Sequence, residues 1–185
     1  MALGCVAGLV LLGGNVLAQT KITRPSGGLP YKITKSGSYF LGANLAVTTK
    51  TTTAIVVNVN YVTINLNGFT ISGLGSSSTG TGIDASAAAG VIIANGTITS
   101  YGTGIKLSSN STVENVQILN NATDGINVSG SSCVVSNSLI SGNSGIGLNF
   151  ADTTSGYLND VLTNSTNVQN GFNMGLNVCS GTACP

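Results

Sequence analysis

The side chains able to carry out acid, base or metal chemistry are few, and they set the first limit on function. The sequence has five carboxylates and six basic residues but no histidine. Without histidine, Ser-His-Asp catalysis and most transition-metal sites are excluded in their usual form. The residues that remain as candidates for a catalytic role are Asp84, Asp124, Asp152, Asp160 and Lys106.

Proton abstraction beside a sugar carboxylate would need clustered acidic Ca²⁺ ligands and a basic Arg or Lys. The carboxylates are scattered along the chain, so we expect no metal site and no cofactor, and Ca²⁺ would matter only in a lyase. Lys106 lies about one repeat from Asp84, which predicts a surface ion pair across neighbouring strands. The alternative is a catalytic Lys106 with Asp84 or Asp124 as its partner.

Glycoside hydrolysis needs two carboxylates roughly 5 to 9.5 Å apart. Asp152 and Asp160 are the best pair for this, since both follow Phe150 within one short stretch. The competing interpretation makes them turn formers among Thr153, Ser155 and Gly156.

The side chains named above lie within a sequence repeat, which determines where they are placed. Glycine precedes an apolar residue at steps of 22, 21, 20 and 26 residues, and these apolar residues are Ile83, Ile105, Ile126, Ile146 and Phe172. Segments of this length rich in Val, Thr, Asn and Gly predict a parallel β-solenoid and not a helical repeat. We expect the glycine at a tight turn, where a positive φ favours it, and the following residue in the core.

A second series runs in step with the first. Four asparagines each stand three residues before an aliphatic residue, and these are Asn95, Asn115, Asn137 and Asn159. They predict a structural ladder in which amides hydrogen-bond from coil to coil, with ligand contact as the alternative. The fold class is therefore all-β, a single parallel β-helix of about five coils.

The chain divides into three parts. Residues 1–18 are apolar and end in Val16-Leu17-Ala18, as in a secretory signal peptide, with a membrane anchor as the alternative. Residues 19–30 predict an extended lead-in, and residues 31–185 the β-helix, with Tyr31 to Leu45 as an N-terminal cap. Cys179 and Cys184 are close enough in sequence to form a disulfide, which fits a secreted protein.

Two segments resemble a known family. ITKSGSYFLGANLAV (33–47) and VTINLNGFTISG (62–73) are similar to the opening of secreted bacterial right-handed parallel β-helix repeat proteins, a group that includes pectate lyases and NosD-type domains. The resemblance covers about Tyr31 to Pro185 and implies the right-handed fold. It does not imply one activity, because the fold carries lyases, hydrolases, epimerases and adhesins. Asn65 stands where many members carry an aspartate.

Binding would use other residues. Tyr101 and Tyr157 are the aromatic candidates for stacking on a sugar if they are exposed, with Tyr61 and Phe69 as further options. Ice binding would need regular Thr rows, yet Thr97-Ile98-Thr99 has no matching successors. Met174 and Leu176 suggest a weakly capped last coil that could associate end to end with another copy.

Charge narrows the partners. The formal net charge is +1, and we expect neither nucleic acid nor, after signal cleavage, a membrane as partner. The first hypothesis is a secreted, non-catalytic β-helix protein that binds polysaccharide or a cell-surface glycan, or contributes to the extracellular matrix. The second is a polysaccharide lyase or glycoside hydrolase of the same fold.

Overall fold

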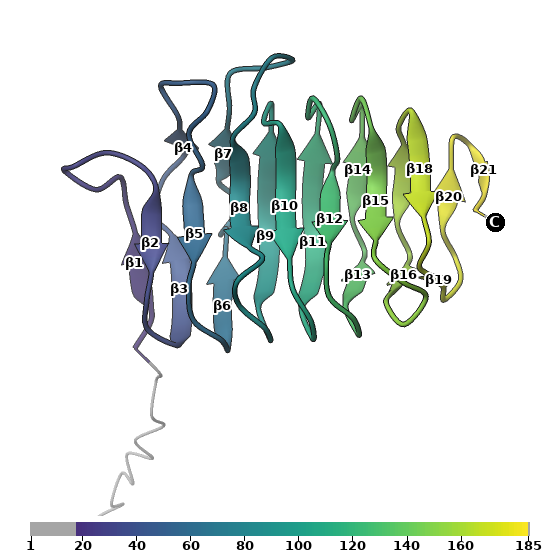
Figure 1. Ribbon diagram of the computed structural model, residues 1–185, viewed down its shortest axis with the longest axis horizontal. Helices are drawn as coiled ribbons and strands as arrows, with labels where there is room; N and C mark the ends of the chain where they lie inside the picture. Colours follow the sequence, from purple (N-terminus) through teal and green to yellow (C-terminus); the bar gives the residue numbers. More distant parts are fainter. Residues whose placement is uncertain (1–17, 185) are drawn as a thin grey trace, which may run out of the picture.

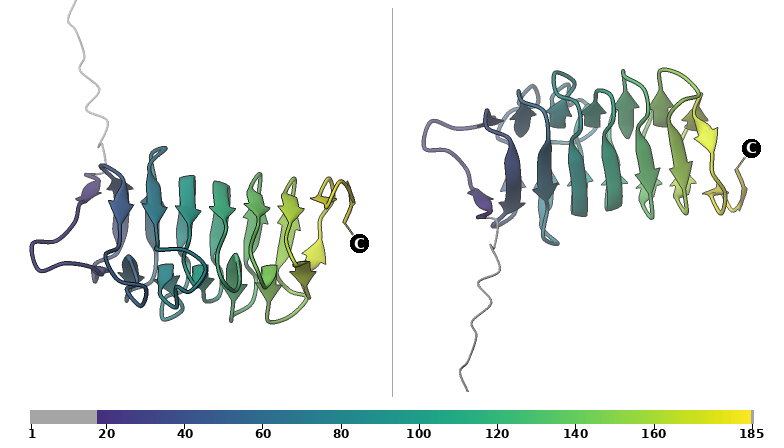
Figure 2. Two further views of the ribbon diagram at one scale, coloured as in Figure 1. Left: turned by 90° about the horizontal axis from the view of Figure 1, so that it is seen from above. Right: turned by 90° about the horizontal axis from the view of Figure 1, so that it is seen from below.

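The chain forms a rod of stacked coils, as the computed structural model shows for residues 18–184 (Figures 1 and 2). Every regular element in this part of the chain is a β-strand, and none of it forms an apolar helix of membrane-spanning length. The segment interpreted as a signal peptide, 1–18, lies outside the described residues apart from Ala18.

Each coil contributes one strand to a seven-stranded parallel sheet. Its strands are β2 (Tyr31–Ile33), β5 (Ile55–Val57), β8 (Thr81–Ala85), β10 (Thr103–Leu107), β12 (Ile126–Val128), β15 (Ile146–Phe150) and β18 (Thr166–Gln169). The sheet therefore counts seven coils, so the sequence-based number of about five was too low.

The other strands form a fourteen-stranded sheet with two arms. The first arm contains β1 (Thr20–Ile22), β3 (Gly37–Leu41), β6 (Val62–Asn65), β13 (Val134–Ser136), β16 (Gly156–Leu158) and β19 (Phe172–Asn173). The second arm contains β4 (Leu45–Ala46), β7 (Thr70–Ser72), β14 (Leu139–Ser141), β17 (Val161–Thr163), β20 (Val178–Cys179) and β21 (Thr182–Ala183). Two longer strands, β9 (Ile92–Thr99) and β11 (Thr112–Leu119), run through both arms.

The predicted N-terminal cap accounts for one of the missing coils. Tyr31 to Leu45 is itself part of the solenoid, because β2 pairs with β5 and β3 pairs with β6. Ile33 and Leu41 from this segment are buried in the common core. The strand beyond it is β1, which lies within the segment expected as a lead-in and pairs with β3.

The apolar repeat forms a continuous inward column, with a correction near its end. Ile83, Ile105 and Ile126 occupy matching positions on neighbouring strands, but the next member is Leu148. Ile146 instead pairs with Thr166, and Phe172 belongs to the other sheet and is 63% exposed. The prediction failed here because Gly145-Ile146 and Gly147-Leu148 both fit the pattern of a glycine before an aliphatic residue. Ile146 and Leu148 are two residues apart and so point to the same side of the strand, and the pattern alone does not tell which of them continues the column.

Gly82, Gly104 and Gly125 of this column are required by close packing and not by a positive φ, which corrects the sequence-based reason, whereas Gly171 has the expected positive φ of 78°. A Cβ added to Gly104 would lie 2.6 Å from the carbonyl oxygen of Gly125 in the next coil and 2.7 Å from Cγ2 of Ile118. Gly82 and Gly125 meet their neighbours in the same way. Ile118 belongs to the aliphatic series that follows the asparagines, so the two sequence repeats interlock inside the rod.

Substituting Gly104 with Ala should therefore destabilise the protein by about 1–3 kcal/mol, because the added methyl group overpacks a site closed by backbone. Urea denaturation followed by circular dichroism measures this change. Gly27→Ala is the matched control, since a Cβ there has nothing within 4 Å and its effect should stay within about 0.5 kcal/mol. Equal stability of the two variants would contradict the packing argument.

The C-terminal end closes with a short reversal of the chain. β20 pairs in parallel with β17, and β21 then folds back antiparallel on β20. Cys179 and Cys184 form a disulfide at this turn. The reversal covers the outer edge of β20.

Candidate functional site

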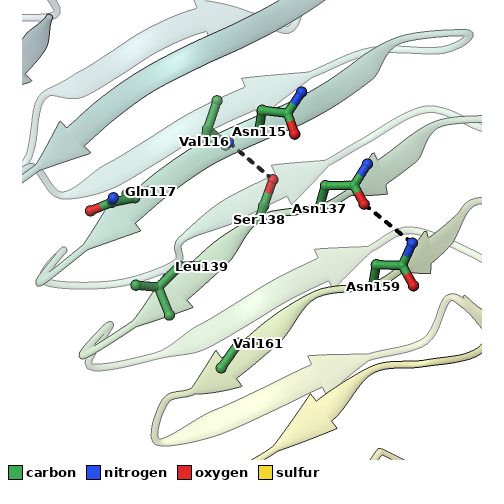
Figure 3. A pocket seen from close by; sticks show the side chains of 8 residues that line it. All are labelled: Asn115, Val116, Gln117, Asn137, Ser138, Leu139, Asn159 and Val161. Atoms are coloured by element: carbon green, nitrogen blue, oxygen red, sulfur yellow. Dashed lines mark hydrogen bonds between the residues drawn. The ribbon is translucent and has the colours of Figure 1, made fainter. Parts of the chain in front are cut away.

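A groove with a volume of about 560 Å³ runs across neighbouring coils where the two arms of the fourteen-stranded sheet meet (Figure 3). The lining residues come from β11, from β14 and β17, and from the turns that precede β14 and β17: Asn115, Val116, Gln117, Asn137, Ser138, Leu139, Asn159 and Val161. Equivalent positions recur in three successive coils, so the groove is itself a repeat along the rod.

The asparagines create the bend on which the groove depends. Asn95, Asn115, Asn137 and Asn159 all have positive φ values, between 52° and 64°. Asparagine tolerates this left-handed conformation better than other non-glycine residues. Each one turns the chain outward between the two arms and remains exposed.

Amide contacts connect some of these exposed asparagines. Nδ2 of Asn159 donates to Oδ1 of Asn137 at 3.2 Å, and Nδ2 of Asn95 donates to Oδ1 of Asn65 at 3.3 Å. Figure 3 shows Asn115, Asn137 and Asn159 in one row, each amide reaching beyond the ribbon. The row therefore offers donors and acceptors to solvent at the spacing of the coils, about 4.8 Å.

A second outward row lies beside the asparagines. Strand register aligns Thr97, Gln117, Leu139, Val161 and Val178. The row changes from polar to aliphatic toward the C-terminus, and Leu139 and Val161 are exposed. The groove thus combines amides on one side with aliphatic side chains on the other.

A buried asparagine column, missed in the sequence analysis, supports the next corner of the coils. Nδ2 of Asn121 donates to Oδ1 of Asn143, and Nδ2 of Asn143 donates to Oδ1 of Asn164, both at 2.8 Å. Each Oδ1 also accepts the main-chain N–H of the preceding asparagine, at 3.0 and 3.1 Å. The signal was present as steps of 22 and 21 residues, but the abundance of asparagine concealed it.

Asn143→Ala should cost about 2–5 kcal/mol of unfolding free energy, because it leaves the main-chain and side-chain donors of Asn121 buried without an acceptor. Thermal and urea unfolding provide the measurement. Asn58→Ala is the control, since Asn58 is exposed and has no positive φ. If both variants unfolded like the wild type, the column would have no stabilising role.

Cys133 occupies a comparable column at a third corner. Its Sγ accepts the main-chain N–H of Ser111 at 3.4 Å, and its own N–H donates to Oγ of Ser155 at 3.0 Å. The side chain is fully buried, and burial raises the pKa of the thiol. The residue therefore has a structural place in the corner, consistent with an unreactive thiol.

The two tyrosines expected to stack on sugar cannot do so. Tyr101 is 0% exposed and Tyr157 is 2% exposed. The hydroxyl of Tyr101 donates to the main-chain oxygen of Ser72, and the Tyr157 ring stacks beside Phe150 with centroids 6.3 Å apart. Burial raises the pKa of both phenols. The prediction was wrong because both rings fill the core beneath a turn.

The two other aromatic options lie in different environments. Tyr61 is 75% exposed at the corner before β6. Phe69 is half-buried and packs against the core. Neither residue lines the groove.

Lys106, Asp84 and Asp124 lie on the outer surface of the seven-stranded sheet or at its edge, outside the groove lining. Lys106 is aligned with Asp84 on one side and Asn127 on the other, as register predicted. The Asp84 carboxylate accepts hydrogen bonds from the N–H and hydroxyl of Ser86. These contacts make Asp84 a turn former at the end of β8.

Asp124 is held by amides. Its Oδ2 accepts hydrogen bonds from Nδ2 of Asn127 and Nδ2 of Asn149, both at 2.9 Å. Its Oδ1 accepts the main-chain N–H of Ile146 at 3.2 Å. Both oxygens therefore have structural partners, which tie two consecutive coils together.

Asp152 and Asp160, the pair considered for glycoside hydrolysis, lie in different environments. Asp152 lies in the loop after β15 and accepts hydrogen bonds from the N–H and hydroxyl of Thr154, which lower its pKa. Asp160 is fully buried. A substrate in solvent could reach only Asp152, so the pair cannot flank a glycosidic bond.

Asp160 belongs to the buried column beneath the groove. Its Oδ1 accepts the N–H of Ser138 at 2.8 Å, and its own N–H donates to Oδ1 of Asn177 at 2.8 Å. Its Oδ2 is buried and, among the described residues, has no hydrogen-bond partner. Burial raises the pKa of this carboxyl to about 7.

Three asparagines in equivalent contacts indicate what Oδ2 lacks. Asn143, Asn164 and Asn177 each accept a main-chain N–H with Oδ1 and donate Nδ2 to the carbonyl three residues before that N–H. By the same register, the carbonyl that corresponds to these for Asp160 is that of Val135, three residues before Ser138. A protonated carboxyl can donate to that oxygen, whereas a carboxylate is repelled by it.

The free energy of unfolding should therefore fall as the pH rises from about 4 to 7. The pKa of Asp160 is higher in the folded protein, about 7, than the usual 3.8, so folding favours the protonated form by up to about 4 kcal/mol. Asp160→Asn supplies a permanent donor and should flatten this profile and stabilise the protein at pH 8. Asp84→Asn, at a partly exposed carboxylate, should keep the wild-type profile.

Urea denaturation between pH 4 and pH 8 distinguishes the two variants. A wild-type stability that does not decline across this range would contradict a buried neutral Asp160. Asp152 does not interfere, because its lowered pKa places its titration below the window.

Among residues 18–184, no group of three or more Cys, Asp or Glu side chains is arranged to hold a metal ion. The fold and the groove together define a parallel β-solenoid with an uncharged surface groove. The family model described as "Right handed beta helix region" matches residues 33–184, and the chain belongs to this family. The right-handed β-helix expected from the sequence is thereby confirmed. Neither the curated proteins nor the solved structures contain a match.

Proposed function

We propose that the protein is a non-catalytic binding module that holds a neutral polysaccharide in the groove between the two arms. The right-handed β-helix fold is consistent with a carbohydrate-related or surface protein. The observation that carries the finer proposal is the lining of the groove, which has an asparagine amide in each of three coils and an exposed aliphatic side chain beside two of them.

The lining chemistry matches a sugar polymer. Side-chain amides of Asn115, Asn137 and Asn159 offer both donors and acceptors to hydroxyl groups. Leu139 and Val161 offer aliphatic surface to the C–H face of a ring. A polymer lying along the rod would meet an asparagine amide in each of three coils and, toward the C-terminus, an aliphatic side chain beside it, so many weak contacts would add up.

Charge favours a neutral ligand over an acidic one. None of the eight lining residues is charged, so a polyuronate would lose hydration without gaining an ion pair. The catalytic candidates Lys106, Asp84, Asp124, Asp152 and Asp160 are not part of the lining. A bound glycan would thus meet no acid or base in the groove.

An extracellular location belongs to the same proposal. It is supported by the apolar segment 1–18, which has the features of a secretory signal. It is also supported by the Cys179–Cys184 disulfide, which persists in oxidising surroundings. In that setting the module would attach to a cell-surface or matrix glycan.

Co-sedimentation with cellulose, xylan and chitin, and with pectate and alginate as acidic comparators, tests the proposal. Soluble reducing ends and unsaturated ends are recorded in the same tubes. We expect retention on at least one neutral polymer without product release. Product formation, or no retention on any neutral polymer, would overturn the proposal.

Removing the groove amides should weaken retention at least tenfold, since each lost hydrogen bond contributes about 0.5–1.5 kcal/mol. The variant replaces Asn115, Asn137 and Asn159 with Gly, which keeps the left-handed turn and removes only the side chain. Asn110→Gly with Asn120→Gly is the matched control, because both residues are exposed, have positive φ and lie outside the groove. Equal loss in both proteins would exclude a specific role for the groove.

A further inference from the structure

The near-neutral total charge conceals a strong separation along the chain. Five of the six basic residues lie between positions 21 and 50, where there is no Asp or Glu. All five carboxylates follow position 83, together with the remaining basic residue, Lys106. In formal charges, the first coils therefore carry five positive charges, and the rest of the rod carries a net four negative charges.

The fold brings the five cations to one end of the rod, the purple and blue end in Figures 1 and 2. This N-terminal collar consists of Lys21 on β1, Lys32 on β2, and Arg24, Lys35 and Lys50 in neighbouring turns and loops. All five side chains are exposed. A balanced composition thus hides a basic surface, which composition alone gave no reason to expect.

Two of these cations are fixed and three remain available. Arg24 donates to the main-chain oxygen of Ala46, and the Lys50 ammonium contacts Oγ of Ser77. Within the described part of the chain, the ammonium groups of Lys21, Lys32 and Lys35 have no hydrogen-bond or ion-pair partner. The positive charge of the collar is therefore not neutralised by the protein itself.

We propose that the N-terminal collar binds a linear polyanion, a flexible chain with repeated carboxylate or phosphate groups. Such a chain can follow cations that are spread around the end of a rod, and its condensed counterions are released on binding. This site is separate from the neutral groove and differs from it in ligand class. The protein would then connect a neutral polysaccharide to an anionic polymer.

Other anionic partners fit the collar less well. Membrane surfaces are usually bound by cations together with exposed apolar side chains that insert between lipids. The exposed large hydrophobic side chains of the described chain begin at Tyr61. Single-stranded nucleic acid is usually held by several exposed rings, whereas Tyr61 is the one highly exposed ring near the collar.

Binding of fluorescent polyglutamate and of inorganic polyphosphate tests the proposal, and the two probes separate carboxylate from phosphate. We expect binding to at least one of them at low salt, with a slope of log K against log salt of roughly −2 to −3.5, at about 0.7 for each cation engaged. Absence of binding to both probes, or binding that ignores salt, would overturn it. Capture by anionic lipid vesicles but by neither soluble probe would also overturn it in favour of a membrane.

The decisive variant replaces Lys21, Lys32 and Lys35 with Gln and keeps the two hydrogen-bonded cations. It should lose at least tenfold in affinity and show a flatter salt slope, while Lys106→Gln, which removes the one cation outside the collar, should bind like the wild type. Retained affinity in the triple variant, or equal loss in Lys106→Gln, would refute the collar. Neutral-glycan retention should be unchanged in the triple variant, so failure of either site can be recognised independently.

Discussion

The structure depends on how its corners satisfy buried main-chain N–H groups. A coil that turns out of its sheet interrupts the regular strand pairing, and an unpaired N–H in the interior is costly. Here a side-chain acceptor from the following coil meets that N–H, as Asn143 does for Asn121 and Asp160 does for Ser138. Sγ of Cys133 accepts the main-chain N–H of Ser111 in the same way. Each coil is therefore completed by its neighbour.

This dependence explains why a chain with so few charges folds as a rod. Glycines such as Gly104 allow the carbonyl groups of the next coil to come close. Polar side chains are used inside, at the corners, and aliphatic columns fill the space between them. The outer surface is then free to vary, so the amides of the groove and the cations of the first coils do not compete with folding.

Sequence periodicity predicted the fold because the inward columns repeat with nearly constant spacing. Ile83, Ile105 and Ile126 could be aligned without a structure, and so could the asparagines that bend the coils. The end of the column was misplaced, since two Gly-aliphatic pairs follow each other at positions 145–148 and both satisfy the pattern. Periodicity determines which side faces inward, but it does not distinguish registers that differ by two residues.

The site was predicted less well, because burial is a property of the whole coil. Tyr101 follows a serine in a turn and appeared available to a ligand, yet it lies under the loops of the adjoining coils. Asp160 looked like one half of a catalytic pair and instead stands where an asparagine would fit. The positions of the basic residues in the sequence already contain the N-terminal collar. It could be recognised only from the structure, which stacks the first coils at one end of the rod.

The coil-by-coil columns have a consequence for how such a protein changes in length. Asn177 receives the N–H of Asp160 and is itself bonded to Asn173, so the column beneath the groove ends within the last coil. Between the ends, each coil offers side-chain acceptors to the coil before it and main-chain N–H donors to the coil after it. After duplication or loss of a whole coil, the donors and acceptors of the newly adjacent coils would still match. The protein could thus change in length by whole coils during evolution while its two ends remain the same.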